Sequence, residues 1–363
     1  MYRSRLLDNV DLQVILTALA LVGVGVFAIA SATMEQPDKA GLWRTQLLWM
    51  VIALAAATVV VVVDYRVWAE AALVLHGVVI LLLVAVLFVG TSVGGNRSWL
   101  VIGPLRLQPS ELAKWTTCLV LAVYLARRVR GSIGLRQLLE MGLLAGVPVM
   151  LIARQPDMGT ALIFLPIFIS ALLIGGVRWK VIVGILIIGL LLTPVVWTQL
   201  KDYQKERIRT VLDPGRDPSG YGYQVRQSKI AIGSGGLTGK GLFRGTQSQL
   251  NFLPAQHTDF VVAVFAEELG FFGASVVLGL FYYLFFRGIV AARSAQDRLG
   301  TYLCLLVVAW ITGQMAVNVG MVLGRLPTIG VPLPFLSYGG SALVAAMCGI
   351  ALIVNVRSRR FVN

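Results

Sequence analysis

The feature that most constrains this chain is a series of long apolar runs, each ended by charges or turn residues. The first run, residues 12–32, has 21 residues, and an apolar helix of about 20 residues is long enough to span the hydrocarbon core of a bilayer. Of the 363 residues, 57% are hydrophobic and only 13% are charged, which excludes a soluble two-domain protein. The chain is therefore predicted to be a polytopic membrane protein.

We expect about ten transmembrane helices in one integral membrane domain over residues 1–363. A lone apolar segment in lipid must satisfy its own backbone hydrogen bonds, and no run alternates with the period of two that an outer-membrane barrel requires. The predicted spans cover residues 12–32, 45–63, 69–90, 110–126, 138–153, 158–175, 181–199, 261–286, 301–324 and 339–355. The fold class is thus all-α, with one long loop, residues 200–260, between the seventh and eighth spans.

The distribution of basic residues predicts the orientation. Short segments on one side of the membrane hold 15 Lys and Arg, and those on the other side hold six. Because cytoplasmic loops are rich in Lys and Arg, both termini are expected in the cytoplasm and the loop 200–260 outside it. The net charge of +14 is interpreted as topogenic charge and as attraction to anionic membrane lipids, with no nucleic-acid partner.

Ionisable side chains near the spans are candidate site residues, because each is costly in hydrocarbon unless it is paired or faces a wet cavity. Glu111 and Lys114 are three residues apart on one face of the fourth span, where they form either a structural ion pair or a charged cavity wall. Asp157 is either the N-cap of the sixth span or a cavity carboxylate. Arg154 either extends to the membrane interface or belongs to the same cavity.

The loop 200–260 contains two glycine-dense stretches, at 233–236 and 239–241, followed by Arg244. Glycines let backbone amides close around anionic oxygens, and Lys240 and Arg244 would supply the countercharge, although a plain flexible loop fits the same pattern. The order of residues is not that of a nucleotide-binding P-loop. Asp259, just before the eighth span, is either a helix cap or a catalytic base at the outer membrane surface.

Six runs together resemble the SEDS family (shape, elongation, division and sporulation). They are QPSELAK (108–114), QPDMGTAL (155–162), AIGSGG (231–236), GTQSQL (245–250), HTDF (257–260) and PLPFLSYGGS (332–341). The resemblance covers nearly the whole chain in the same order. Within the family, the GTQSQL run and the short N-terminus favour the rod-shape members over the division members. Ala255, Arg325 and the pair Thr328 and Ile329 depart from the family pattern, which limits what can be inferred for those loop positions.

The resemblance implies a ten-helix peptidoglycan glycosyltransferase in the cytoplasmic membrane. Such an enzyme polymerises lipid II on the outer face and works with a class B penicillin-binding protein, a transpeptidase. It also implies that Asp259 is the catalytic residue and that Glu111, Lys114 and Asp157 line a central cavity.

The residues alone lead to the same class of chemistry. A site that faces outward has no access to cytosolic nucleotide sugars, so its sugar donor must arrive linked to a lipid. Asp259 would act as general base in an inverting transfer that releases undecaprenyl pyrophosphate. Lys114, Arg154, Lys240 and Arg244 are candidates to bind the diphosphate. A divalent cation, Mg²⁺ or Mn²⁺, could share that work, although no run of ligands indicates a metal site.

The rival hypothesis is a flippase or other transporter of lipid-linked sugars, in which Glu111, Lys114 and Asp157 line a translocation path. Midplane charges and broken helices would favour it. Here the charges lie near the outer ends of the spans and the long loop faces one side only, which favours an enzyme.

Overall fold

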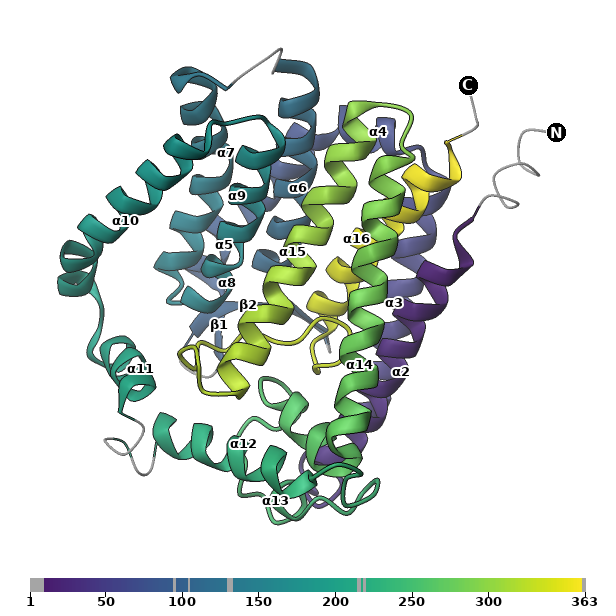
Figure 1. Cartoon of the computed structure of the whole chain (residues 1–363), viewed down its shortest axis with the longest axis vertical. Coiled ribbons are helices and arrows are strands. Elements are labelled where there is room, and N and C mark those ends of the chain that lie inside the picture. The colour runs from purple at the N-terminus through teal and green to yellow at the C-terminus, as the bar shows by residue number, and fades with distance from the viewer. Residues whose placement is uncertain are drawn as a thin grey trace.

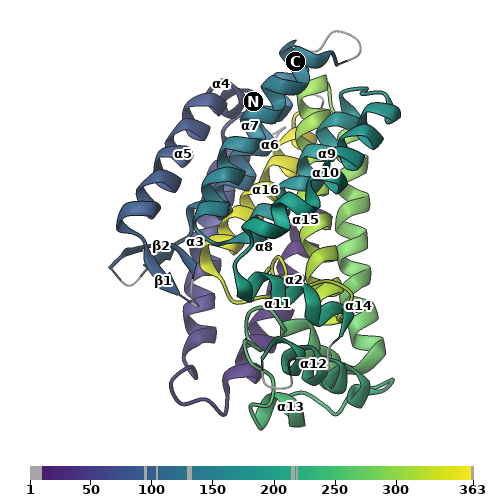
Figure 2. The ribbon, with the colours of Figure 1, turned by 90° about the vertical axis from the view of Figure 1, so that its left-hand side faces the viewer.

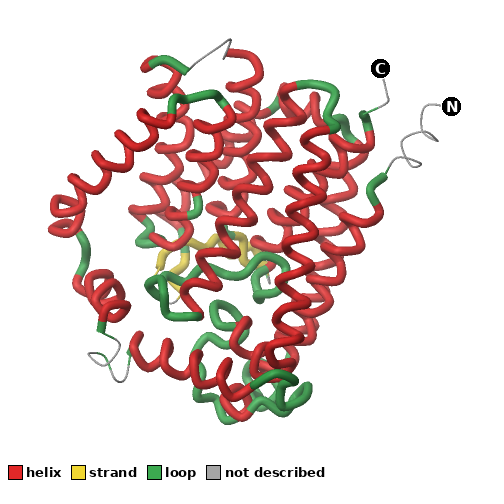
Figure 3. The backbone as a smooth tube through the Cα atoms, viewed as in Figure 1, coloured by secondary structure: helices red, strands yellow, loops and turns green. Residues whose placement is uncertain are grey.

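The structure, a computed structural model, describes residues 10–93, 96–103, 105–128, 133–213, 217 and 220–360. In this part of the chain, long helices form a bundle, with the start of the first described helix and the end of the last near one end and short helices and loops at the other (Figure 1). Helices dominate the backbone, as the red tube of Figure 3 shows. Arg3, Arg5 and Arg130, which entered the charge count, lie outside the described residues.

Each predicted span corresponds to a helix, or to a pair of helices, in the structure. The helices of the bundle are α2 (Leu12–Thr33), α3 (Leu42–Val62), α4 (Tyr65–Glu70), α5 (Ala72–Val89), α6 (Pro109–Arg128), α7 (Leu135–Arg154), α8 (Met158–Leu162), α9 (Phe164–Ile174), α10 (Trp179–Gln199), α14 (Val261–Arg293), α15 (Arg298–Val322) and α16 (Gly340–Ser358). The sixth span is divided between α8 and α9. The all-helical polytopic fold class is confirmed.

By length and composition, seven helices among the described residues can cross a membrane: α2, α3, α5, α7, α14, α15 and α16. α6 carries Glu111 and Lys114 near its start and two arginines in its last turn. The segment Met158–Ile174 is a shorter apolar helix, and so is the apolar part of α10, Trp179–Leu191. Compared with the seven helices, α6 therefore carries more charge, and the other two segments are shorter.

The centre of the bundle is α16, which packs against α3, α6, α14 and α15 and is buried over most of its length. α10 lies at the edge of the bundle and, among the helices, packs mainly against α9. From α10 the chain continues into α11 (Asp202–Leu212) and α12 (Tyr221–Gly235), which follow the left edge and the lower end of Figure 1. Figure 2 shows α11, α12 and α13 (Thr246–Gln249) together at this lower end.

Three short strands between α5 and α6 were not expected from the sequence. β1 (Thr91–Val93), β2 (Asn96–Ile102) and β3 (Leu105–Leu107) form an antiparallel sheet in the order β1-β2-β3. The Arg97 side chain anchors the sheet by donating hydrogen bonds to the carbonyl oxygens of Gly90 (2.7 Å) and Phe88 (2.6 Å) at the end of α5. The middle strand of the sheet packs against α6 and contributes to the site described below.

α14 is broken near its start by Gly270, whose φ of 66° is not helical. The glycine-rich loop after α12 fits against this break. Backbone amides of Lys240 and Gly241 donate to the Glu267 and Glu268 carbonyls (3.1 and 3.0 Å), while the Phe271 and Phe272 amides donate to residues 236 and 237. Glycine is required at 239, because a Cβ there would lie 2.0 Å from the Glu268 carbonyl oxygen. The loop therefore satisfies the backbone groups that the break exposes.

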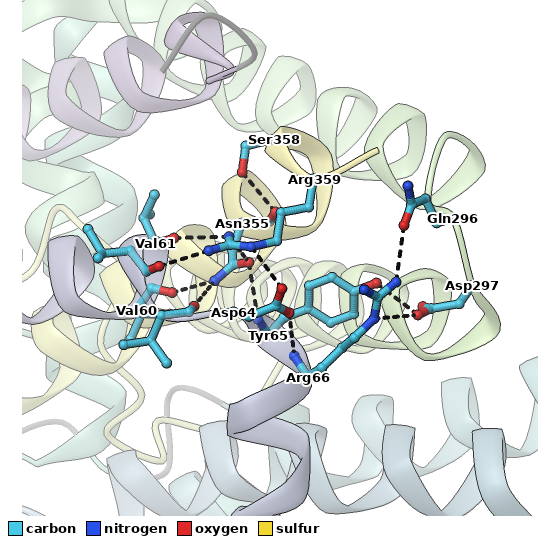
Figure 4. A network of polar contacts seen from close by, with 12 residues as sticks. Val60, Val61, Asp64, Tyr65, Arg66, Gln296, Asp297, Asn355, Ser358 and Arg359 are labelled. Atoms are coloured by element: carbon cyan, nitrogen blue, oxygen red, sulfur yellow. Dashed lines mark hydrogen bonds and ion pairs between the residues drawn. The ribbon is translucent and has the colours of Figure 1, made fainter. Parts of the chain in front are cut away.

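At the opposite end of the bundle, side chains in the last turn of α16 and just after it cap the end of α3 (Figure 4). The last carbonyls of a helix have no partner within the helix. Asn355 donates from Nδ2, and Arg359 donates from both terminal nitrogens, to the carbonyl oxygens of Val60, Val61, Val62 and Val63. Arg359 also pairs with Asp64 at 3.1 Å. This network joins the end of the chain to the connection between α3 and α4.

Candidate active site

A polar cavity of about 280 Å³ lies at the end of the bundle that carries α11 to α13. Residues far apart in sequence line it: Ser98, Trp99, Gln108, Glu111, Asp157, Thr160, Arg207, Thr258, Asp259, Ile329, Gly330, Pro332, Tyr338, Gly339 and Ala342. Four of the six family-like runs contribute to this wall. Of the seven site residues expected from the sequence, the cavity brings together Glu111, Asp157 and Asp259.

Asp259 lies in the turn that leads into α14, and that turn is fixed by its backbone. The Asn318 amide of α15 donates to the Asp259 carbonyl oxygen (2.9 Å) and to the Val331 carbonyl oxygen (2.7 Å). The Tyr338 amide donates to the carbonyl of His257 at 2.9 Å. The turn is thus fastened to α15 and to the loop 331–338, and the Asp259 side chain faces the cavity.

The structure distinguishes between the two roles that the sequence left open for Asp259. The N-cap of α14 is Phe260, with no side-chain cap, and no residue in the described ranges donates a hydrogen bond to the Asp259 carboxylate. Burial raises the pKa of this carboxyl from 3.8 to about 6, with Arg207 lowering it and Asp157 raising it. A carboxylate with a pKa near neutrality that caps nothing is suited to accept a proton.

Glu111 and Lys114 form a buried ion pair, with Nζ 2.8 Å from the carboxylate and each residue only 1% exposed. Lys114 also donates to Gln314 Oε1 at 2.9 Å, and the Trp310 indole nitrogen donates to the same oxygen at 3.0 Å. Glu111 reaches the cavity wall, whereas Lys114 lies behind it. The pair thus joins α6 to α15 and contributes to the cavity through its carboxylate.

Asp157 fulfils both of the alternatives that its sequence position allowed. It is the N-cap of α8, where its carboxylate accepts from the Thr160 amide (3.2 Å) and hydroxyl (2.9 Å). It also accepts from Gln108 Nε2 at 3.0 Å and lines the cavity. Burial raises the pKa of this carboxyl. The cap therefore holds Asp157 in place beside the start of α6.

The other predicted phosphate-binding residues are not part of the cavity lining. Lys240 donates from Nζ to Glu267 at 2.6 Å and to the Thr246 hydroxyl at 2.7 Å, so its charge is compensated by a buried carboxylate. Arg154, at the end of α7, and Arg244, just after the second glycine-dense stretch, are exposed. The glycine-dense stretches dock on the break in α14, which explains their composition by close packing.

Arg207 of α11 is a cavity residue that sequence reasoning missed. Its guanidinium lies over the ring of Tyr221 at 4.4 Å and 5.6 Å from the ring of Tyr203. Its Nε is buried and has no hydrogen-bond partner among the described residues. Among the described lining residues it is the only Lys or Arg. Nothing in the composition of the loop 200–260 distinguishes Arg207 from its neighbouring cations, so only the path of the chain reveals it.

The carboxylates of the cavity also bear on metal binding. In the described part of the chain, no three His, Cys, Asp or Glu side chains gather closely enough to hold a metal ion. Mg²⁺ is often bound by one or two carboxylates together with substrate phosphates. A divalent cation in this cavity would therefore take oxygens from its substrate in addition to Asp157 or Asp259.

Fold and site together define a polytopic helical membrane protein with a polar cavity at one end of its bundle. The model of the FtsW, RodA and SpoVE family, described as cell cycle protein, matches residues 11–361. The chain belongs to this family. That membership confirms the SEDS family predicted from the six sequence runs.

Three similar proteins agree with this assignment. The peptidoglycan glycosyltransferase MrdB of Escherichia coli (strain K12) is 38% identical over 355 residues, which cover 97% of this chain and 94% of the relative. A chain of a solved peptidoglycan synthase complex, concerned with the coordination of polymerization and crosslinking, has a TM-score of 0.83 and 32% identity, over 98% and 99% of the two chains. The rod-shape-determining protein RodA of Thermus thermophilus has a TM-score of 0.73 and 29% identity, over 98% of each chain.

These matches bear on two predictions. The resemblance to rod-shape members is confirmed, because the relatives include MrdB and RodA. The names of the relatives support a glycosyltransferase and do not support the rival transporter of lipid-linked sugars.

Proposed function

We propose that this chain polymerises lipid II into glycan strands on the outer face of the cytoplasmic membrane, for cell elongation and rod shape. The single observation that carries the mechanism is Asp259: a carboxylate with a pKa of about 6 that faces a polar cavity and caps no helix. The family membership and the named relatives support the activity.

In the proposed reaction, Asp259 accepts the proton of the acceptor sugar hydroxyl as that oxygen attacks the anomeric carbon of the donor. The bond between the anomeric carbon and the phosphate oxygen breaks, and its electrons leave with undecaprenyl pyrophosphate. Attack opposite the leaving group inverts the anomeric centre. A base whose pKa is near the working pH is largely ionised at neutral pH and still accepts a proton readily.

The leaving diphosphate requires positive charge in the cavity. Arg207 meets this requirement best, since its Nε lacks a partner among the described residues and its guanidinium is held by stacking on Tyr221. Guanidinium groups bind phosphate oxygens with two parallel hydrogen bonds. Glu111, Lys114 and Asp157 then shape the wall that receives the sugars. Arg154 and Arg244, which are exposed, are assigned to the approach of the lipid-linked substrate over the outer surface, whereas Lys240 stays paired with Glu267.

The proposal includes a partner and a location. A class B penicillin-binding protein, a transpeptidase, is the proposed partner, which agrees with the similarity to a chain of a peptidoglycan synthase complex. The chain is proposed to lie in the cytoplasmic membrane as one integral domain, with both termini in the cytoplasm and the loop 200–260 outside. The helical ends nearest the termini and the end that holds the cavity would then face opposite sides of the membrane.

Purified protein incubated with labelled lipid II, with and without the transpeptidase partner, tests the activity. We expect glycan polymer that disappears with Asp259→Asn. Transport of labelled lipid II across a vesicle membrane without polymer formation would instead establish the rival function.

Cysteine labelling in spheroplasts tests the orientation independently. In an otherwise cysteine-free protein, a cysteine in place of Gln204 or of the exposed Leu250 should react with an impermeant thiol reagent, and one in place of Ser132 should not. Labelling at position 132 alone would reverse the proposed orientation.

A further inference from the structure

A second hollow, of about 370 Å³, lies at the opposite end of the bundle from the candidate active site. It opens between the start of α5, the last turns of α6 and the first turns of α7, and we name it the α5–α6–α7 groove. It is lined by Leu73, Val120, Val123, Tyr124, Arg127, Arg128, Glu140, Leu143 and Leu144. Glu111 and Arg128 are 17 residues apart on α6, so about 25 Å of helix separates the groove from the catalytic cavity.

The groove has an apolar body and a basic mouth. Five of its lining residues are Leu or Val, contributed by all three helices, and the two arginines come from the last turn of α6. Leu73 and Leu143 are each 64% exposed. An exposed apolar wall at the level of a helix end is a surface that acyl chains can cover.

The only carboxylate in the described lining is already compensated. Glu140 accepts from the Tyr124 hydroxyl at 2.6 Å and from Arg136 Nε at 2.9 Å. Neither Arg127 nor Arg128 is ion-paired to a residue that the structure describes. Glu140 feels the charge of Arg128 but is already paired with Arg136, so its single charge cannot neutralise both arginines at the mouth of the groove.

We propose that the α5–α6–α7 groove binds an anionic phospholipid, with its phosphate on Arg127 and Arg128 and an acyl chain along the apolar wall. Guanidinium groups match phosphate oxygens in geometry and charge, and basic pockets between transmembrane helices bind anionic lipid headgroups. A zwitterionic lipid should bind less well, because the cation of its headgroup offsets its phosphate and leaves the two arginine charges uncompensated. A soluble anion should also bind less well, because it leaves the apolar wall of the groove uncovered.

Assigning the lipid to the cytoplasmic leaflet depends on the proposed orientation, which places this end of the bundle in the cytoplasm. The binding itself does not depend on that orientation. The cytoplasmic leaflet is rich in anionic lipids. The simpler account of the arginines is that they favour the C-terminal end of the α6 dipole and fix the topology. That account predicts no preference for one lipid over another.

Native mass spectrometry of the full chain in mild detergent can separate these accounts. Phosphatidylglycerol and phosphatidylcholine are added at equal concentrations, and the bound fraction of each is measured. We expect phosphatidylglycerol to bind preferentially and Arg127→Gln with Arg128→Gln to weaken its binding by at least about tenfold. Arg293→Gln with Arg298→Gln is the matched control, because it removes two exposed charges elsewhere at the same end and should leave binding unchanged.

Two further arms test the apolar wall and the source of the phosphate. Leu143→Trp keeps every charge but fills the groove, and should reduce phosphatidylglycerol binding. Inorganic phosphate at millimolar concentration should not displace the lipid. Arg127→Lys with Arg128→Lys keeps the charge without the planar fork and should show intermediate binding, which separates a lost site from a misfolded protein.

Equal binding of the two lipids would overturn the proposal, as would an equal loss in the control variant. Displacement by inorganic phosphate would show a simple anion site without an acyl-chain wall and would also overturn it. None of these measurements uses lipid II, so their outcome is separate from that of the proposed polymerase activity.

Discussion

Replacing Asp259 with asparagine should abolish activity and, at neutral pH, stabilise the fold. Asparagine keeps the size of the side chain but cannot accept the proton, and loss of a general base costs about 10²- to 10⁴-fold in rate. The gain in stability has a separate origin. The folded protein holds the carboxyl in a poorly solvated cavity wall that raises its pKa from 3.8 to about 6, so ionising it in the folded state costs free energy.

The size of this gain follows from the pKa. A raised pKa of about two units corresponds to about 3 kcal/mol. Because the folded carboxyl binds its proton more tightly than the unfolded one, the wild-type protein loses this stability as pH rises from about 4 through about 6. The permanently neutral asparagine does not titrate. The stability difference between variant and wild type should therefore be small near pH 4 and approach about 3 kcal/mol above pH 7.

Thermal unfolding in detergent, followed by intrinsic tryptophan fluorescence, can measure this difference at both pH values, because Trp115 and Trp310 are buried in the folded protein. Melting temperatures of wild type and Asp259→Asn are compared at pH 5.0 and 7.5, alongside lipid II polymerisation at pH 7.5. Glu35→Gln, which removes an exposed carboxylate in the loop between α2 and α3, is the matched control and should change neither quantity.

Two results would refute the reasoning. A variant that polymerises lipid II at nearly the wild-type rate would exclude Asp259 as the base. A stability difference that is the same at both pH values would show that the carboxyl is not titrating in a poorly solvated wall, and the proposed pKa would be wrong even if activity were lost.

Substitutions at four other positions test the buried ion pair, Arg207 and the docking of the glycine-rich loop. Glu111→Ala or Lys114→Ala leaves a buried charge without its partner and should cost about 3–5 kcal/mol; the double variant should lose less than the sum in unfolding measurements, and strict additivity would exclude coupling. Arg207→Gln should impair polymerisation more than Arg207→Lys, with unchanged melting temperatures, and equal rates for wild type and Arg207→Gln would remove it from the diphosphate site. Gly239→Ala should cost about 1–3 kcal/mol from its positive φ alone, and more from its overlap with Glu268; an unchanged melting temperature would contradict the tight docking.

The sequence predicted the spans well, because in lipid an apolar run of sufficient length has few alternatives to a helix. The two roles weighed for Asp157 proved compatible, since a cap residue at a helix start can also line a cavity. The pairing of Glu111 with Lys114 followed from helical periodicity alone. In each case the decisive contact was local in sequence.

Contacts between distant segments could not be predicted in the same way. Lys240 was expected to face phosphate, but it binds Glu267, 27 residues away, because the glycine-rich loop docks on a break in α14. The sheet next to α6 was missed because its strands are only three to seven residues long. Arg207 was missed because its distance from Asp259 depends on the path of α11 across the cavity.

One face of α15 explains how a cavity built from loops can hold Asp259 in a fixed position. Gln314 and Asn318 are one turn apart and therefore lie on the same face of the helix. Asn318 holds the backbone at 259 and 331, while Gln314 holds the backbone at 332 and binds Lys114 of the buried pair. Amides in a membrane span are costly unless they are satisfied; both ends of the Gln314 amide and the nitrogen of the Asn318 amide have partners, the loop carbonyls, Lys114 and Trp310. Asp259 and the opposite wall are thus positioned by a rigid helix, so neither loop needs to be rigid by itself.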